Sequence, residues 1–305
     1  MPLGLRPARL TWGAAIGVMA GALMAASLVH GGASRGRSPH DIATGARPPA
    51  AERPGSFRVE CSLVRQARID PIVAPGQPSH HLHQLFGNTS LAPESTYVSM
   101  LTGGTSCTAP GDTAGYWSPA LVAPDGTIAR PDRAVIYYRN RPAGRVATTP
   151  FPRDFRMIAG GGDAFPNAYW TCDGEKDAAK QTRRAYVPDC GAGGSVKLHV
   201  FFPSCWDGAG IDAPDHRSHV AYGLGEEGRP DGTHPVACPR SHPVEIPQLD
   251  YRVVFPARGG AGYRLADGQT IPHADFWNTW QQRELEALVQ RCLWKGINCR
   301  LVGYS

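Results

Sequence analysis

Histidine side chains stand close together in the segment 80–83, whose sequence is HHLH. In an extended segment, residues two apart point to the same face, so His81 and His83 project together while His80 faces the other way. Two imidazoles on one face suit acid and base chemistry near neutral pH, or the binding of a divalent metal ion. The alternative is that His81 and His83 only form hydrogen bonds at the end of a strand.

A second concentration of reactive side chains follows the strand-like segment 196–202. The loop after it contains Asp207, Asp215, His216 and His219 within thirteen residues. An Asp beside a His can fix the tautomer of the imidazole and raise its basicity. We therefore expect His216 and His219 to be catalytic partners that Asp215 and Asp207 orient. About half of this loop is expected to be structural, because Asp residues also stabilise turns.

A third segment, 271–278, lies directly before a predicted helix and contains His273 and Asp275. These two side chains share a face if the segment is extended, which makes both of them catalytic candidates. A metal held by His81 and His83 needs a third ligand, such as His219, His273 or a carboxylate. The H-E-x-x-H pattern of a helical metal site does not occur in the sequence.

Three further side chains are candidates for binding a substrate. Arg217 could hold an acidic sugar through its guanidinium group. Trp206 and Tyr169 could stack on sugar rings, although large aromatic side chains also fill the space between sheets, and Trp206 fits that core role better. A serine nucleophile at Ser204 or Ser218 is conceivable, but the G-x-S-x-G turn that supports such a nucleophile is absent.

Many short β-branched or aromatic runs alternate with Gly, Pro, Asp and Asn, which predicts an all-β fold, a β-sandwich or jelly roll. One C-terminal α-helix is predicted, with Thr279 as its cap and Gln282 three residues later, packed on the outside of the sandwich. The predicted strands are Phe57–Val64, Thr96–Leu101, Tyr116–Val122, Ala134–Tyr138, Phe155–Ile158, Ala168–Cys172, Val196–Phe202, His219–Tyr222 and Tyr251–Phe255.

The N-terminal part of the 305-residue chain differs from the rest. Residues 1–33 have two arginines and a long apolar run, which predicts a signal peptide or a retained membrane anchor. Residues 34–55 have almost nothing to bury and predict a flexible linker, so residues 56–305 are expected to form a single domain. Secretion, or anchoring at the membrane surface by the apolar segment, follows from this organisation.

The net charge of +5 comes mostly from four arginines that precede the first acidic residue, and without them 27 basic residues face 26 acidic ones. A nearly neutral domain lacks the basic surface of a nucleic-acid-binding protein, so no nucleic-acid partner is expected. We expect a monomer.

The eight cysteines form an even set without the C-x-x-C spacing of a zinc site, which in an exported chain predicts disulfides. Eight cysteines allow 105 pairings. Pairing of neighbours is the simplest arrangement: Cys61 with Cys107, Cys172 with Cys190, Cys205 with Cys238, and Cys292 with Cys299.

Seven motifs occur in a fixed order from about Phe57 to Cys299: RIDPIVAPGQPSHHLHQLFGN, GYWSPAL, FRMIAG, LHVFFPSCWDG, APDHRSHVAYG, CPRSHPVEIPQLDYRVVFP and HADFWNTW. In this respect the chain resembles the domain-of-unknown-function family numbered 1996. The resemblance implies an exported protein of bacteria and fungi, in fungi sometimes joined to carbohydrate-binding modules, and it implies no activity. Its motif positions fall on His81, His83, Cys205, Trp206, Asp207, Asp215, His216, Ser218, His219, His273, Asp275 and Phe276.

The preferred function is a carbohydrate-active hydrolase or lyase that acts on an extracellular or cell-wall polysaccharide. The alternative from another class is a non-catalytic cell-surface module that binds carbohydrate or has a structural role. A further alternative is a metal-dependent phosphodiesterase or nuclease, in which His81 and His83 would hold a divalent metal.

Overall fold

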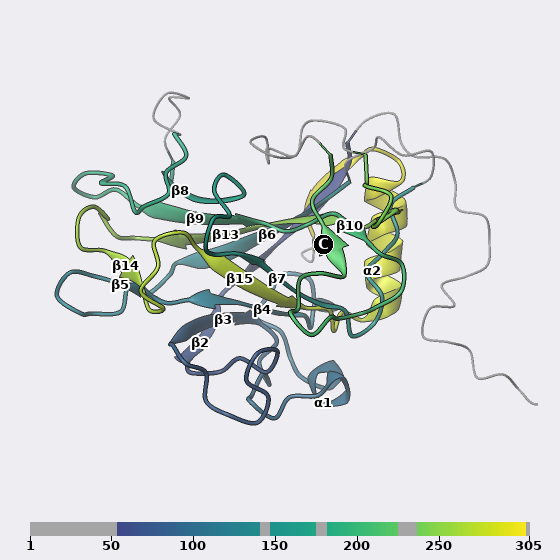
Figure 1. Ribbon diagram of the computed structural model, residues 1–305, viewed down its shortest axis with the longest axis horizontal. Coiled ribbons are helices and arrows are strands. Elements are labelled where there is room, and N and C mark those ends of the chain that lie inside the picture. The colour runs from purple at the N-terminus through teal and green to yellow at the C-terminus, as the bar shows by residue number, and fades with distance from the viewer. Residues whose placement is uncertain (1–53, 141–146, 175–181, 225–236, 303–305) are drawn as a thin grey trace, which may run out of the picture. The chain divides into compact units, whose positions relative to one another are not determined.

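Two β-sheets face each other in the computed structural model, and their inner sides enclose the main hydrophobic core (Figure 1). The structure describes residues 54–140, 147–174, 182–224 and 237–302. All of these residues belong to one compact unit that spans residues 39–305. The prediction of a β-sandwich is therefore confirmed.

The first sheet has six strands in the order β16-β1-β6-β13-β9-β8. Neighbouring strands are antiparallel, except that β1 and β16 run parallel. The strands are β1 (Ser56–Cys61), β6 (Arg133–Arg139), β8 (Ala168–Cys172), β9 (Val196–Phe201), β13 (Gln248–Phe255) and β16 (Asn298–Leu301).

The second sheet has five antiparallel strands in the order β2-β3-β4-β15-β7. Strand β15 comes late in the sequence but lies between β4 and β7, so both of its edges pair with strands from far earlier in the chain. The strands are β2 (Leu63–Ala67), β3 (His83–Gly87), β4 (Gly115–Pro119), β7 (Arg156–Gly160) and β15 (His273–Trp277).

The core between the sheets is built from alternate residues of their strands, as the two-residue period of a β-strand requires. Phe86 of the five-stranded sheet packs edge to face on Tyr251 of the six-stranded sheet, with ring centroids 6.3 Å apart. The hydroxyl groups of Tyr116 and Tyr138 form a 2.6 Å hydrogen bond across the same space. These contacts hold the two sheets in fixed register.

The outer face of the five-stranded sheet has a hydrophobic cluster of its own. Leu85, Trp117, Ile158 and Trp277 project from four adjacent strands on this face, and the cluster also includes residues of the segment 69–100. The short helix α1 (Tyr97–Leu101) belongs to that segment and lies beside the β2–β3 end of the sheet (Figure 1). A loop layer therefore covers part of this face, and polar side chains occupy the rest of it.

The remaining elements are small. A three-stranded sheet has the order β11-β10-β12, and β14 pairs with β5. Helix α2 continues into a π-helical segment, η1, whose buried side chains join the main core at one end of the sandwich (Figure 1). The bounds are β5 (Leu121–Val122), β10 (Cys205–Trp206), β11 (Val220–Ala221), β12 (Val244–Glu245), β14 (Arg264–Leu265), α2 (Gln282–Leu288) and η1 (Val289–Leu293).

Two local predictions are wrong. The segment Thr96–Leu101 is helical, because Thr96 and Ser99 form a reciprocal capping box that starts α1. Helix α2 has Gln281 at its N-cap without a side-chain hydrogen bond. Thr279 does not cap this helix, since its hydroxyl group donates to the carbonyl of Thr113 in a buried pairing between two loops.

Four disulfides are present, and they join neighbouring cysteines: Cys61–Cys107, Cys172–Cys190, Cys205–Cys238 and Cys292–Cys299. They indicate an extracellular protein, because such bonds persist in oxidising compartments. The predicted signal peptide or anchor at residues 1–33, and nearly all of the predicted linker, lie outside the described residues. In the described part of the chain, no helix has the length and apolar character that crossing a membrane requires.

Candidate functional site

The outer face of the five-stranded sheet carries His83, His273 and Asp275 on neighbouring strands. His83 begins β3 and pairs with Pro119 of β4, while His273 begins β15 and pairs with Gly160 of β7. Asp275 lies two residues after His273 and therefore on the same face. Side chains from two segments that are far apart in the sequence thus meet on one sheet surface.

His81 completes a cluster of three imidazole rings with His83 and His273. The ring centroids are 4.2 Å apart for His81 and His83, 5.2 Å for His81 and His273, and 6.2 Å for His83 and His273. One nitrogen from each ring lies within 4.8 Å of the nitrogens of the other two, so the three rings could hold a metal ion. The prediction that His81 and His83 share a face is confirmed.

Two carboxyl groups lie beside the imidazole cluster. Asp70 and Asp275 each have a carboxylate oxygen within 4.8 Å of a His83 nitrogen and of each other. One oxygen of Asp70 accepts backbone hydrogen bonds from Ile72 and Val73. Burial raises the pKa of Asp70 and raises the pKa of Asp275 well above its usual range, with a further rise for Asp275 from the negative charge of Asp70.

The pKa values of His83 and His81 are lowered, which favours the neutral form of these two rings. Burial lowers the pKa of His83 well below its usual value, and the neighbouring His81 and His273 lower it further. The pKa of His81 is lowered by burial and by His273, although Asp267 opposes this shift. A neutral imidazole is the form that accepts a proton or binds a metal ion.

The orientation of His273 is set by two neighbours. Its Nδ1 atom lies 3.1 Å from Oδ2 of Asp267. On the neighbouring strand, the backbone of Gly160 lies very close to the backbone of Pro272. A Cβ atom on residue 160 would lie 2.2 Å from the carbonyl oxygen of Pro272. Gly160 also has φ of +79°, a conformation that favours glycine. The β7–β15 edge is therefore packed tightly at the histidine.

An open pocket of 480 Å³ lies over the cluster. His81, His273, Asp70 and Asp275 line it together with the guanidinium-bearing side chain of Arg217. Arg217 is exposed, and its Nη1 atom donates to the carbonyl oxygen of Ile158 at 3.3 Å. The pocket thus combines a buried base of imidazole and carboxyl groups with a positive charge at its rim.

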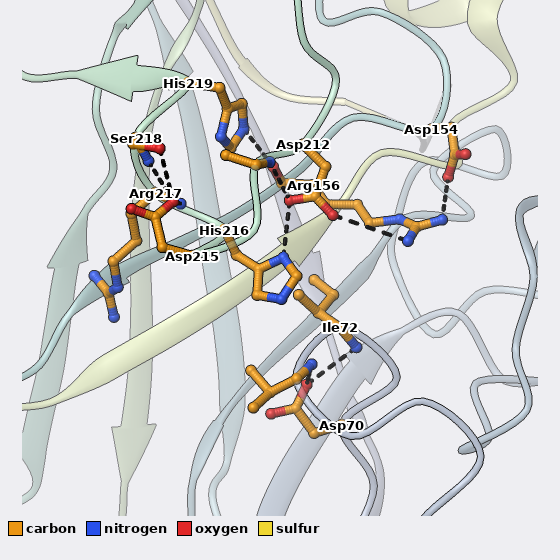
Figure 2. Close-up of polar contacts among 12 residues, drawn as sticks. Asp70, Ile72, Asp154, Arg156, Asp212, Asp215, His216, Arg217, Ser218 and His219 are labelled. Atoms are coloured by element: carbon orange, nitrogen blue, oxygen red, sulfur yellow. Dashed lines mark hydrogen bonds and ion pairs between the residues drawn. The ribbon is translucent and has the colours of Figure 1, made fainter.

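His216 lies beside this region, in the loop that contains Arg217, although it is not among the described residues that line the pocket. Its Nδ1 atom lies 2.8 Å from Oδ1 of Asp212, and its carbonyl oxygen accepts a hydrogen bond from the backbone of Ile158 in β7. Figure 2 shows the ring below Asp212, on the side of the loop that faces Asp70. His216 is in the left-handed backbone region with φ of +56°, which is uncommon for a side chain of this size.

The remaining two acidic candidates in this loop stabilise turns. Asp215 accepts hydrogen bonds from the backbone of Arg217 and from the backbone and hydroxyl of Ser218, and these bonds lower its pKa to about 2 (Figure 2). Asp207 accepts backbone hydrogen bonds from the two residues that follow Gly208. Neither carboxylate has a hydrogen bond to His216 or His219 in the described contacts.

The other candidates lie away from the imidazole cluster. His219 is buried against Phe155, and its Nε2 atom lies 2.7 Å from the carbonyl oxygen of Arg156. Trp206 is buried in the core, as its aromatic character favours. Tyr169 lies on the six-stranded sheet, stacked on His199 with the ring centroids 4.5 Å apart.

The two serine candidates have other partners. Ser204 is 1% exposed, and its carbonyl oxygen accepts a backbone hydrogen bond from Ile246. The hydroxyl group of Ser218 donates to Asp215, which leaves it without a histidine partner among the described contacts. The arrangement does not form a Ser-His-Asp triad.

Sequence reasoning missed Asp70 and Asp267 as members of the site. Each has a local signature of a turn, since Asp70 precedes a proline and Asp267 precedes a glycine. Asp212 was visible as an acidic residue four positions before His216, but its role depends on the loop conformation. A search for carboxylates shortly before each histidine segment would have found all three.

Comparison with known proteins identifies the family of the chain. A search of curated proteins and a search of solved structures each found no match. Residues 70–280 match the family described as a domain of unknown function, DUF1996. This range includes every residue of the imidazole cluster and of the loop that contains His216. The chain therefore belongs to the DUF1996 family.

Proposed function

We infer that the protein is an extracellular enzyme that cleaves an acidic polysaccharide at this pocket, as a hydrolase or a lyase. The observation that carries this inference is the convergence of His81, His273 and Asp275 at an open pocket, with the buried ring of His83 beside the two other imidazoles. Proton transfer requires imidazole and carboxyl groups with shifted pKa values at one point, whereas a binding module does not require them.

Arg217 supports an acidic substrate. Its side chain is exposed at the rim of the pocket and lies close enough to lower the pKa of Asp275 through its charge. A guanidinium group pairs with a carboxylate in a bidentate manner, which suits the carboxyl group of a uronic acid. A sugar bound in this way would present its ring to the imidazoles below.

His216 and Asp212 support proton transfer. The carboxylate holds Nδ1 of the imidazole, which leaves the other ring nitrogen to exchange a proton with a bound sugar. The paired-carboxylate mechanism of many glycosidases fits this pocket less well. Asp70 and Asp275 are 4% and 1% exposed, so they cannot flank a glycosidic bond from its two sides.

The test is a screen of the full-length protein on acidic and neutral polysaccharides. Release of reducing ends without ultraviolet absorption of an unsaturated product indicates a hydrolase, and release of reducing ends together with that absorption indicates a lyase. His81→Ala and His216→Ala are expected to lose turnover, while His242→Ala, a histidine outside the pocket, retains it. Binding of a glycan that survives both substitutions, with no turnover of any substrate, would support the non-catalytic module instead.

The same screen includes bis(4-nitrophenyl) phosphate. The imidazole cluster also suits the phosphodiesterase or nuclease alternative, because metal-dependent enzymes of that kind use nitrogen and carboxylate ligands. Cleavage of this substrate at a rate that depends on His81 would favour that alternative over polysaccharide cleavage.

A further inference from the structure

His83 is buried without the hydrogen bonds that its ring requires. Its side chain is 0% exposed, and neither ring nitrogen makes a hydrogen bond of standard geometry in the described part of the protein. The Ile69 carbonyl favours a proton on this ring, but it does not satisfy the second nitrogen. An imidazole has two nitrogen atoms to satisfy, and leaving a buried polar atom without a partner destabilises the folded state.

Three more orphaned atoms lie in the same place. The Nε2 atom of His81 and both carboxylate oxygens of Asp275 are buried and have no hydrogen-bond partner among the residues described. Buried polar groups in folded proteins are nearly always paired, so several unpaired groups at one point indicate a missing ligand. Each neutral imidazole offers one nitrogen lone pair, and a carboxylate offers only acceptor oxygens, so this donor set favours a cation as the ligand.

We propose that His81, His83 and His273 bind one divalent transition-metal ion, with Asp275 supplying negative charge beside it. The three ligand nitrogens lie within 4.8 Å of one another. Zinc–nitrogen bonds of about 2.0–2.1 Å would bring such atoms closer together, and small side-chain rotations achieve this.

The ligand set selects the class of metal. Three imidazoles suit zinc, copper, nickel or iron, whereas magnesium and calcium prefer oxygen ligands. The pocket leaves one side of the cluster open, which is the arrangement of a catalytic rather than a structural zinc site. The inference deepens the proposed function, on which it rests, because the ion would occupy the same pocket.

Asp267 is the positioning residue of this site. Its Oδ2 atom lies 3.1 Å from Nδ1 of His273, and its Oδ1 atom accepts a backbone hydrogen bond from Gln269. A carboxylate on Nδ1 fixes the ring so that Nε2 is the metal-binding atom. Asp267 lies in the loop before β15, so it orients His273 without contacting the ion.

The experiment measures metal binding without any substrate. The full chain, purified without a histidine tag, is treated with a chelator and titrated with Zn²⁺ by calorimetry, and Co²⁺ is then added as a spectroscopic probe. One equivalent of Zn²⁺ should bind, and Co²⁺ should give the visible absorption of a nitrogen-ligated ion. Binding below one tenth of an equivalent would overturn the proposal.

Variants locate the ion. His81→Ala and His273→Ala should weaken Zn²⁺ binding at least 100-fold, and Asp267→Asn should weaken it about 10–100-fold, as loss of an outer-shell partner does. His242→Ala should leave the affinity unchanged. Equal affinity in all four variants would overturn the assignment. Near-ultraviolet circular dichroism confirms that each variant is folded, and Asp267→Asn, which removes no ligand, decides the question if a histidine variant does not fold.

The two proposals can fail separately. Turnover that needs His216 but is unaffected when the protein is free of metal would leave the proposed function standing and remove the metal site. One tightly bound Zn²⁺ at the three histidines, with no turnover of any polysaccharide, would support the metal site and remove the proposed function.

Discussion

Asp212 holds His216 through a 2.8 Å contact between Oδ1 and Nδ1, whereas the described hydrogen bonds of the Asp215 carboxylate in the same loop all go to its own turn. Asp212 also lies 3.9 Å from Arg156, which stacks on Trp277 of the sheet (Figure 2). The carboxylate therefore connects the loop histidine to the strand layer that carries the imidazole cluster.

Replacement of Asp212 by Asn is expected to lower turnover by about 10²–10⁴-fold, because His216 would lose the group that fixes its tautomer. The measurement is kcat and KM on the substrate found by the screen, with kcat changing and KM nearly constant. Asp215→Asn is the matched control, since it removes an acidic residue three positions later that only caps a turn. An equal loss of kcat in both variants would show that the loop conformation, rather than the Asp212–His216 contact, is what matters.

Replacement of Gly160 by Ala is expected to destabilise the protein by about 2–4 kcal/mol, because the backbone has a positive φ and the new Cβ would meet the carbonyl of Pro272. His273 follows Pro272, so its ring should also move and Zn²⁺ binding should weaken. Gly162→Ala is the control, as Gly162 also has a positive φ but has no atom within 4 Å of the Cβ position, and it should cost about 1 kcal/mol. Urea unfolding curves of the two variants give the comparison, and equal midpoints would contradict it.

Asp250 predicts how stability depends on pH. Burial alone would raise its pKa, but Arg252 and Arg139, at 2.5 and 2.9 Å, lower it to about 2. A carboxylate with a depressed pKa stabilises the fold above its unfolded value of about 3.9, and this contribution is lost as the pH falls towards 2. The corresponding difference in the free energy of unfolding is about 3 kcal/mol.

Unfolding of Asp250→Asn measured between pH 7 and pH 2 tests this expectation. The variant should be less stable than the wild type at pH 7, because two partly buried arginines lose an ion-pair partner, and the gap in stability should narrow below pH 4. A gap that stays constant down to pH 2 would show that Asp250 is not the group that titrates.

Replacement of His219 by Ala is expected to lower the free energy of unfolding by about 2–4 kcal/mol, because it leaves a cavity beside Phe155 and an unpaired carbonyl at Arg156. Zn²⁺ affinity should not change, since His219 lies outside the imidazole cluster. Thermal unfolding and Zn²⁺ titration on the same sample separate the two effects. If His219→Ala lost Zn²⁺ binding without any loss of stability, His219 would instead be part of the metal site.

Sequence periodicity predicted much of this site for a physical reason. His81 and His83, and likewise His273 and Asp275, are two residues apart, and a two-residue period places side chains on one face of any extended segment. The same pattern cannot show which strands become neighbours. The pairing of β4 with β15 joins segments more than 150 residues apart, so the meeting of His83 and His273 follows from the tertiary fold alone.

Local sequence patterns gave wrong predictions where the same residue types occur in two different kinds of structure. Thr96–Leu101 contains two β-branched residues and an aromatic residue, which predict a strand, but its capping box makes it a helix. Asp70 resembles an ordinary turn residue and does stabilise a turn with one oxygen. Its proximity to His83 and Asp275 depends on the loop layer over the sheet, which no local pattern specifies.

Strand β15 lies inside its sheet but is synthesised after the strands on both sides of it. Residues 273–277 complete the sheet between β4 and β7, so a chain that is still being made, or that is cut before this segment, lacks the strand that carries His273 and Asp275. The imidazole cluster therefore assembles only after nearly the whole chain is available. A fragment that ends before residue 273 would have His81 and His83 but neither His273 nor Asp275, so the cluster cannot form until residue 273 has been synthesised.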